Sequence, residues 1–227
     1  MNPSNSLIRL TDLSENTAPR LPVALCLDVS GSMNGVPLEE LNRGIAAFFD
    51  SLRVNPLASR SAEVSITLFS GEPELALDFT ALKRVTDAPQ IETAEGSTNL
   101  AGGVNTALDA LDRCRRDMRA AGVDHYKPFL VIMSDGSPNV GDHEQAARRV
   151  RQLEDQRRIV VFPIGVGDAV DMDVLSLFSK RGALHLKGLN FAAFFEWLSR
   201  SVGAVSSSNV GDTVSLPKEG MDDWLEY

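Results

Sequence analysis

The sequence predicts an α/β fold: a doubly wound, mostly parallel sheet flanked by helices on both faces, with one antiparallel edge strand. Apolar runs of strand length alternate with amphipathic runs of helical length along the whole chain. This alternation is typical of parallel strands joined by right-handed crossovers, which place helices on both faces of the sheet. Several apolar runs contain no polar alternation, which indicates strands that are covered on both faces.

The composition is that of an ordinary globular protein with 43% hydrophobic and 23% charged residues among 227. A chain of this length can bury a core of its own. We expect one domain at residues 21–205, preceded by a lead-in at 1–20 and followed by an acidic and aromatic tail at 206–227. The formal net charge of −9 argues against binding to nucleic acids or to anionic membranes.

In the first half of the chain, the polar lead-in contains "LIRL", which is compatible with a short edge strand. A helix begins near Pro37, a residue favoured in the first helical turn, and its apolar residues recur at helical spacing. "ELALDFT" alternates, as expected of a strand in a hairpin at the sheet edge. The predicted elements are a buried strand at 21–28, a helix at 37–54, strands at 62–70 and 74–80, and an irregular segment at 80–97.

In the second half, apolar runs and amphipathic runs continue to alternate. Gly122 is the expected stop of the first long helix in this half. The predicted elements are a helix at 99–122, a buried strand running into a loop at 127–139, a helix at 143–158, a buried strand at 159–168, a short helix at 171–180, a short strand at 183–187 and a last helix at 190–205.

Two helices of this half are rich in arginine. Solvated helix faces explain such a pattern, and a local basic patch for an acidic protein partner is the alternative. The arginines are Arg113, Arg115, Arg116, Arg119, Arg148, Arg149, Arg151, Arg157 and Arg158.

The two cysteines, Cys26 and Cys114, fall in a predicted strand and a predicted helix, and we expect both to be reduced and at least partly buried. The first residues contain no apolar segment typical of a signal peptide, and no apolar stretch is long enough to span a bilayer. We therefore expect a cytoplasmic protein.

Oxygen-bearing side chains follow two predicted strands and precede one helix. Hydroxyl and carboxylate oxygens without a nearby His or Cys suit Mg²⁺, Mn²⁺ or Ca²⁺ better than zinc or copper. Each group also has an ordinary structural explanation: side-chain turns at Asp28 and Ser30, a helix N-cap at Thr98 and a turn at "SDG". The side chains in question are Asp28, Ser30 and Ser32, then Ser97 and Thr98, then Ser134 and Asp135.

Three stretches, "DVSGSM", "GSTNLAGGVNTAL" and "FLVIMSDGSPN", resemble the metal-ion-dependent adhesion site of von Willebrand factor A domains. The resemblance covers roughly residues 20–203, and in finer detail the chain is similar to bacterial tellurium-resistance proteins of the TerY type. It implies that hydroxyls of Ser30, Ser32 and Thr98 contact a divalent cation. It also implies that Asp28 and Asp135 hold the cation through water or directly.

The resemblance further implies that the cation's open position takes a Glu or Asp carboxylate from a partner protein. Such a protein would be a scaffold or adaptor in a stress-response or phage-defence system. Its partner would be a kinase, phosphatase or ATPase encoded in the same gene cluster. The alternative is a metal-carrying subunit that works with a MoxR-type ATPase.

An enzyme is the least favoured class. Phosphatases that use a strand-end aspartate beside Mg²⁺ resemble Asp-x-Asp, whereas Ser30 occupies the second position here. "SGSMNG" does not match Gly-x-Ser-x-Gly, and no phosphate-binding loop is present. The sequence therefore predicts a binding module without catalytic residues, with a Mg²⁺-dependent phosphohydrolase as a remote alternative.

The tail ends in "MDDWLEY", which places Trp224, Leu225 and Tyr227 among acidic residues. Aromatic side chains gain by burial, so we expect this segment to dock, either on its own domain or in a groove of a partner. The arginine-rich helices are the candidate docking faces on the domain itself.

Overall fold

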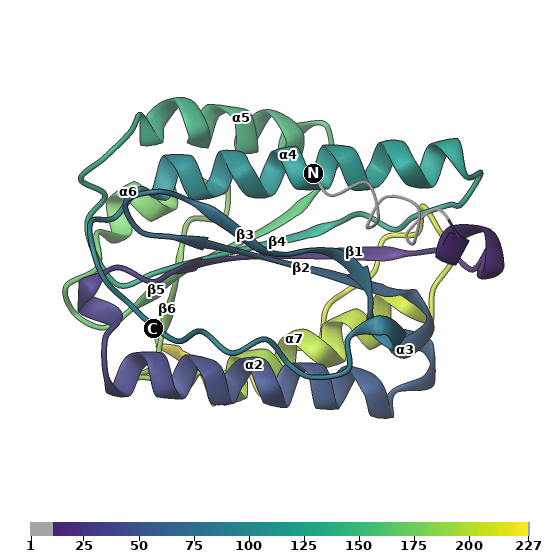
Figure 1. Cartoon of the computed structure of the whole chain (residues 1–227), viewed down its shortest axis with the longest axis horizontal. Helices are drawn as coiled ribbons and strands as arrows, with labels where there is room; N and C mark the ends of the chain where they lie inside the picture. Colours follow the sequence, from purple (N-terminus) through teal and green to yellow (C-terminus); the bar gives the residue numbers. More distant parts are fainter. Residues whose placement is uncertain (1–10, 227) are drawn as a thin grey trace.

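The computed structural model describes residues 11–226. Its seven-stranded sheet has the order β3-β2-β1-β4-β5-β6-β7 and lies between two layers of helices (Figure 1). The strands are β1 (Leu21–Asp28), β2 (Ala62–Phe69), β3 (Glu74–Ala81), β4 (Phe129–Ser134), β5 (Val160–Val166), β6 (Leu184–Leu186) and β7 (Leu225–Glu226).

The pairing of the strands confirms the predicted fold class. β1, β2, β4, β5 and β6 pair in parallel, and β3 is the predicted antiparallel edge strand. All eight residues of β1 are buried because this strand lies in the middle of the sheet. Cys26, at the centre of β1, is buried and reduced, as expected.

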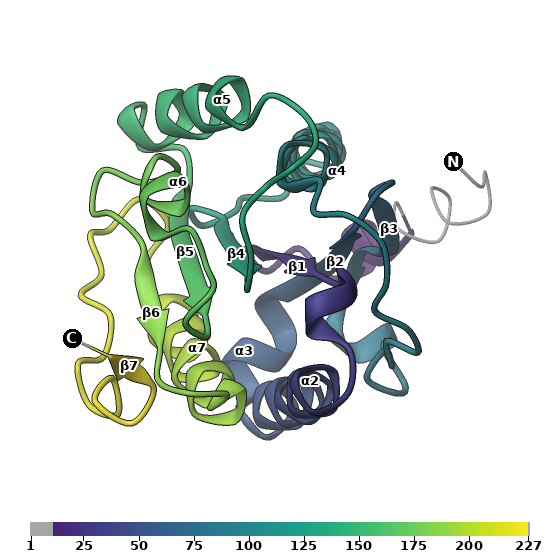
Figure 2. The same ribbon diagram turned by 90° about the vertical axis from the view of Figure 1, so that its left-hand side faces the viewer.

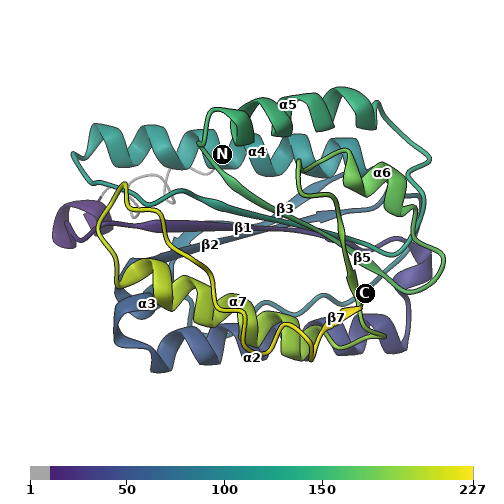
Figure 3. The ribbon, with the colours of Figure 1, turned by 180° about the vertical axis from the view of Figure 1, so that it is seen from behind.

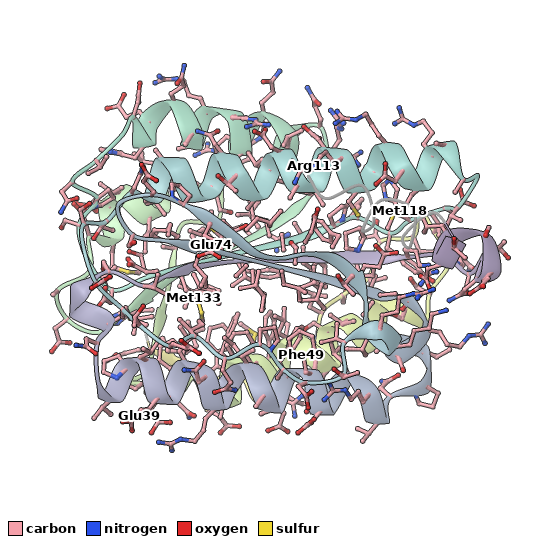
Figure 4. All side chains as sticks on the ribbon, in the orientation of Figure 1. Glu39, Phe49, Glu74, Arg113, Met118 and Met133 are labelled. Atoms are coloured by element: carbon pink, nitrogen blue, oxygen red, sulfur yellow. The ribbon has the colours of Figure 1, made fainter. Side chains whose placement is uncertain are left out.

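Helices cover both faces of the sheet (Figures 1 and 2). The helices on one face are α2 (Val36–Val54), α3 (Pro56–Ser61) and α7 (Phe191–Ser206), and those on the other are α4 (Leu100–Ala120), α5 (His143–Asp155) and α6 (Met172–Ser176). Phe49 points from α2 toward the sheet and Glu39 points outward in Figure 4, as the amphipathic pattern requires.

The core is divided by the sheet into two apolar layers. The layer beneath α2 and α7 is rich in aromatic side chains, including Phe48, Phe195 and Trp197. The layer beneath α4 and α5 is built mainly from alanine and branched aliphatic residues. Gly44 lets α2 and α7 approach closely, because a Cβ at this position would lie 2.7 Å from Phe195 Cδ2.

Three local features differ from the sequence-based expectations. Residues 11–15 are helical rather than strand-like, and "LIRL" lies outside the described residues. Helix α3 was not predicted, although Asn55 caps it by accepting hydrogen bonds from the N–H groups of Leu57 and Ala58. The tail adds the short strand β7, antiparallel to β6, at the edge opposite β3.

The tail docks on its own domain but not on the arginine-rich helices that we had considered. Trp224 is fully buried, with its ring 5.0 Å from that of Phe194 and 5.2 Å from that of Trp197 of α7. The Lys187 N–H donates to the Trp224 carbonyl over 2.7 Å. Figure 3 shows the tail running along α7 toward β6, on the face of the sheet away from α4 and α5. Apolar burial, not charge attraction, decides its position.

Within residues 11–226, no helix is both long enough and apolar enough to cross a membrane.

Candidate metal centre

The carboxyl ends of β1 and β4 and the beginning of α4 meet at one edge of the sheet, onto which Figure 2 looks. In parallel sheets this edge is where ligands collect, because loops from neighbouring strands converge there. Backbone hydrogen bonds tie the loops together: Val29 N–H donates to Phe69 O, Glu95 N–H to Val29 O and Gly31 N–H to Gly96 O.

Asp28 is the buried anchor of this edge, with a relative exposure of 1%. Its Oδ1 accepts a hydrogen bond from the Ser30 N–H at 2.9 Å, which is the side-chain turn expected of an aspartate at this position. Its Oδ2 accepts a hydrogen bond from Ser134 Oγ at 2.5 Å. The carboxylate is thus held on both oxygens, once by its own loop and once by the end of β4.

Ser30, Ser32 and Asp135 form a chain of oxygen atoms next to this anchor. Ser30 Oγ and Ser32 Oγ lie 3.2 Å apart, and Ser32 Oγ donates to Asp135 Oδ1 over 2.8 Å. Ser30 is buried, Ser32 is exposed and Asp135 is half-buried. The group therefore reaches from the interior to solvent.

Thr98 lies at the same edge but is held by its backbone. Its N–H donates to Asn139 Oδ1 over 3.0 Å, and its carbonyl accepts from the Asn139 N–H over 3.2 Å. A Cβ placed on Gly136 would lie 3.9 Å from Thr98 Oγ1, so the Thr98 hydroxyl faces the residue that follows Asp135.

The helix N-cap considered for Thr98 is wrong, because Asn99 takes that role and accepts a hydrogen bond from the Gly102 N–H. The Thr98 hydroxyl is therefore not used in capping. The neighbouring Ser97 hydroxyl faces the β2–β3 turn, 3.4 Å from the position that a Cβ on Gly71 would take. Of the two adjacent hydroxyls, the one of Thr98 faces the β4 loop.

Burial governs the electrostatics of both carboxylates. Burial raises the pKa of Asp28, hydrogen bonds from Ser134 and Ser30 lower it in part, and the charge of Asp135 raises it further. Burial also raises the pKa of Asp135, and the hydrogen bond from Ser32 opposes this effect. Two carboxylates that repel each other in a desolvated site favour a compensating cation.

The donor set consists of hydroxyls and carboxylates. Within residues 11–226, no group of three or more His, Cys, Asp and Glu side chains is arranged to hold a metal ion. Oxygen donors of this kind fit a hard divalent cation, which accepts neutral and charged oxygen ligands together.

The sequence pattern identified the residues of this edge but not the contacts that position them. Ser134 was one of the candidate oxygen-bearing residues, and its role in fixing the Asp28 carboxylate was not predicted. Asn139 pairs with the backbone of Thr98 and joins the β4 loop to the beginning of α4. The position of Asn139 in the loop after Asp135 was the one hint in the sequence. The residue to which a loop side-chain amide binds cannot be predicted from the neighbouring sequence.

Residues 23–193 match the model of the von Willebrand factor type A domain family. The chain belongs to this family. Domains of this family mediate metal-dependent protein interactions and carry a divalent metal at their adhesion site.

A curated relative is an uncharacterized protein, sll0103, of Synechocystis, 25% identical over 172 residues that cover 73% of this chain and 37% of the relative. Proximal thread matrix protein 1 of the mussel byssus, with a zinc-occupied adhesion site, has a TM-score of 0.58 and 16% identity, covering 82% of this chain and 48% of that one. The pilus adhesin SpaC of Lactobacillus rhamnosus GG, in an open conformation, has a TM-score of 0.65 and 13% identity, covering 83% and 31%.

The chain thus spans about a third to a half of the length of these proteins. At these identities the solved structures show a shared fold.

Proposed function

We propose that this protein is a metal-dependent protein-interaction module. A divalent cation binds at the carboxyl edge of the sheet and captures a Glu or Asp side chain of a partner protein. The observation that supports this most is the row of hydrogen-bonding contacts that links Asp28 to Ser30, Ser30 to Ser32 and Ser32 to Asp135, with the Thr98 hydroxyl facing the same loop.

Ser30, Ser32 and Thr98 are the hydroxyl ligands in this proposal, and Asp28 and Asp135 hold the cation directly or through water. Hydroxyls are neutral, so a cation held largely by them keeps enough positive charge to attract an outside carboxylate. Mg²⁺ is the proposed ion, with Mn²⁺ and Ca²⁺ as alternatives, because all three prefer oxygen ligands.

The proposed role excludes catalysis by this chain. Ser30 stands where a phosphatase of the Asp-x-Asp type has its second carboxylate, and domains of this family are generally not catalytic. His185 does not supply a base at this edge, because its ring nitrogens lie 2.9 Å from Gly167 O and 3.2 Å from Glu226 Oε2.

The cellular setting that we propose follows from the resemblance to TerY-type proteins. It is a cytoplasmic adaptor in a tellurium-resistance-like stress response or in phage defence, with a kinase, phosphatase or ATPase as its partner. A MoxR-type ATPase is the alternative partner.

Calorimetric titration with Mn²⁺ and Mg²⁺ tests the metal site. We expect one site per chain in the wild type, no binding in Asp28→Ala and weakened binding in Thr98→Ala. Ser97→Ala is the matched control, because this hydroxyl faces Gly71 instead of the β4 loop. Equal binding by the wild type and Asp28→Ala, or a larger loss in Ser97→Ala than in Thr98→Ala, contradicts the assignment.

Affinity purification from the native host in Mg²⁺ and in EDTA tests the partner. A protein that is retained with Mg²⁺, released by EDTA and not retained by Thr98→Ala supports the proposal. Its identity as a kinase, phosphatase or MoxR-type ATPase decides between the two settings. Retention that is indifferent to EDTA shows that the metal site does not carry the interaction.

A further inference from the structure

The arginines of α4, of α5 and of the segment that follows α5 divide into a set with ion pairs and a set without. Arg149 of α5 contacts Asp109 and Asp112 of α4 at 2.6 and 3.6 Å, and Arg148 contacts Glu144 at 3.4 Å. Among residues 11–226, no acidic side chain forms an ion pair with Arg115, Arg116, Arg119, Arg151, Arg157 or Arg158. The arginines without an ion pair require an explanation, because the chain has a net charge of −9 and so carries an excess of acidic residues.

Arg115 is the centre of this unpaired set. Its Nε and Nη1 are buried and have no hydrogen-bond partner. The charges that act on Arg115 include those of two further cations, Arg158 and Arg119, besides that of Asp112, which is already paired with Arg149. Arg119 lies one turn beyond Arg115 on α4, and Arg158 lies two residues before β5. Desolvated guanidinium donors beside like charges are unfavourable unless an anion neutralises them.

The acidic residues closest to Arg158 in sequence are engaged elsewhere. Glu154 accepts hydrogen bonds from the Ser179 hydroxyl at 2.9 Å and the Lys180 N–H at 2.8 Å, and Asp155 pairs with the Lys180 side chain. The helix dipole of α4 favours a cation in its last turn, and this accounts for Arg119 alone. Neither local pairing nor the dipole explains the convergence of three arginines from two segments.

We infer that Arg115, Arg119 and Arg158 form a second interaction surface, which binds a carboxylate-rich segment of a partner protein. The exposed guanidinium groups of Arg119 and Arg158 can each match a carboxylate in two parallel hydrogen bonds, and Arg115 adds positive charge beneath them. Arg116 and Arg157, the chain neighbours of Arg115 and Arg158, are also exposed. A short acidic peptide segment is favoured over nucleic acid, because it contacts only the arginines, whereas an extended nucleic acid also meets the strongly negative remainder of the chain.

The arginine surface lies at the end of the sheet opposite the candidate metal centre. Arg158 precedes β5, and Arg115 is fifteen residues beyond Leu100, where α4 begins, so about 22 Å of helix separates the two sites. In Figure 4, nitrogen-tipped side chains project from the outer side of α4 and α5. A single chain can therefore hold one acidic partner at the metal and another at the arginine surface. The partner at the metal rests on the proposed function, whereas the partner at the arginine surface does not.

The test uses the full chain and a fluorescently labelled oligoglutamate peptide, followed by anisotropy at low salt in EDTA. We expect binding that weakens as salt is added and that falls about tenfold in Arg115→Gln, Arg119→Gln and Arg158→Gln. Arg43→Gln is the matched control, since it makes the same charge change on α2, on the opposite face. An equal loss in Arg43→Gln, or none in the three variants, overturns the proposal.

Two further measurements separate recognition from structure and from general polyanion binding. Arg115→Met should keep or raise the melting temperature, because the buried Nε and Nη1 lack acceptors, whereas a structural arginine would lower it. A labelled oligothymidylate of equal charge should bind more weakly than the oligoglutamate, and equal or tighter binding overturns the choice of partner. The titration in EDTA does not depend on the metal site, so failure of that site leaves this result unaffected. If the peptide fails to bind in EDTA and binds only after Mg²⁺ is added in excess, the proposal is overturned.

Discussion

Asp28 shows how one buried carboxylate is prepared for a cation by residues from two strands. Ser134 of β4 donates to it over 2.5 Å, and the two side chains are 1% exposed. A hydrogen bond to a buried carboxylate fixes its direction and keeps it charged, so its removal disturbs any ligand that the carboxylate holds.

We therefore expect Ser134→Ala to lower the affinity for Mn²⁺ about tenfold in a calorimetric titration, although Ser134 is not among the proposed ligands. Ser199→Ala is the control, because this buried hydroxyl bonds to Glu196 O within α7. An unchanged affinity in Ser134→Ala would show that the carboxylate is held in place without it.

His125 is the second residue with a testable consequence. Burial and the positive charges of Arg115 and Arg119 lower its pKa below 6.5, against the opposing effects of its hydrogen bond to Tyr126 O and of Asp124. The unfolded state therefore binds the proton more readily, so the stability that His125 contributes is present above pH 6.5 and is lost as the pH falls.

Denaturant unfolding of the wild type and His125→Asn between about pH 7 and pH 5 measures this effect. We expect the wild type to lose more stability than the variant over this range, since asparagine keeps a donor for Tyr126 O but does not titrate. Parallel curves would show that His125 titrates alike in the folded and unfolded states.

For single residues, the sequence predicted which side chains belong to the candidate site but not which groups they bind. The positions of Asp28, Ser30, Ser32 and Asp135 after apolar runs predicted their convergence, and the structure links these four residues by hydrogen-bonding contacts, with Asp28 joined through the Ser30 N–H. The role of Asn99 as the cap of α4, and of Ser134 as the partner of Asp28, depends on backbone geometry and long-range contact, which a linear pattern does not contain.

Among the elements, α2 and α7 make the closest helix contact, and Gly44 is where they meet. A Cβ here would lie 2.7 Å from Phe195 Cδ2 and 2.9 Å from Phe191 Cβ. Real Cβ atoms do not approach so closely, so either the ring or the helix must move.

Gly44→Ala should therefore destabilise the fold by about 1–3 kcal/mol in denaturant unfolding, although the same change in an exposed helix stabilises by about 1 kcal/mol. Combining it with Phe195→Leu should cost less than the sum of the two single changes, because the clashing ring atoms are removed. A stabilising Gly44→Ala would contradict this packing.

Element boundaries were predicted best where apolar periodicity is long and worst where a cap alone defines the element. The pattern from Pro37 gave α2 to within a residue. Helix α3 has six residues, which are too few for a periodic pattern of apolar residues. The Asn55-Pro56 pair at its beginning was the available sequence indication of a helix. The docking of the tail was anticipated from Trp224, but its position was not, because the pocket formed by Phe194 and Trp197 arises only when α7 has folded.

For the whole molecule, the proposed cation should couple binding to stability. A ligand that binds only the folded chain stabilises it by about 2.7 kcal/mol at a hundred times its dissociation constant. We expect Mg²⁺ to raise the melting temperature of the wild type and not that of Asp28→Ala, since only the former retains the buried carboxylate. A shift of equal size in both proteins would indicate a cation bound elsewhere.

The alternation of strands and helices was sufficient to predict the sheet and the two helical layers, because right-handed crossovers leave few other arrangements. It did not predict that the chain returns to the sheet after α7. Two residues, Leu225 and Glu226, carry too little pattern to be recognised as a strand.

That short return has a consequence for association between molecules. β7 occupies the free hydrogen-bonding edge of β6, while β3 at the other edge carries Glu74 and Asp78. Unpaired edges recruit strands from other chains, and charge or cover prevents it. A protease that cuts between α7 and Trp224 would release β7 and expose the edge of β6. Strands of other molecules could then pair with this edge, which leads to aggregation. Light scattering after removal of residues 207–227 should show growing particles. A stable, unaggregated product would mean that the edge of β6 does not need β7 to prevent association.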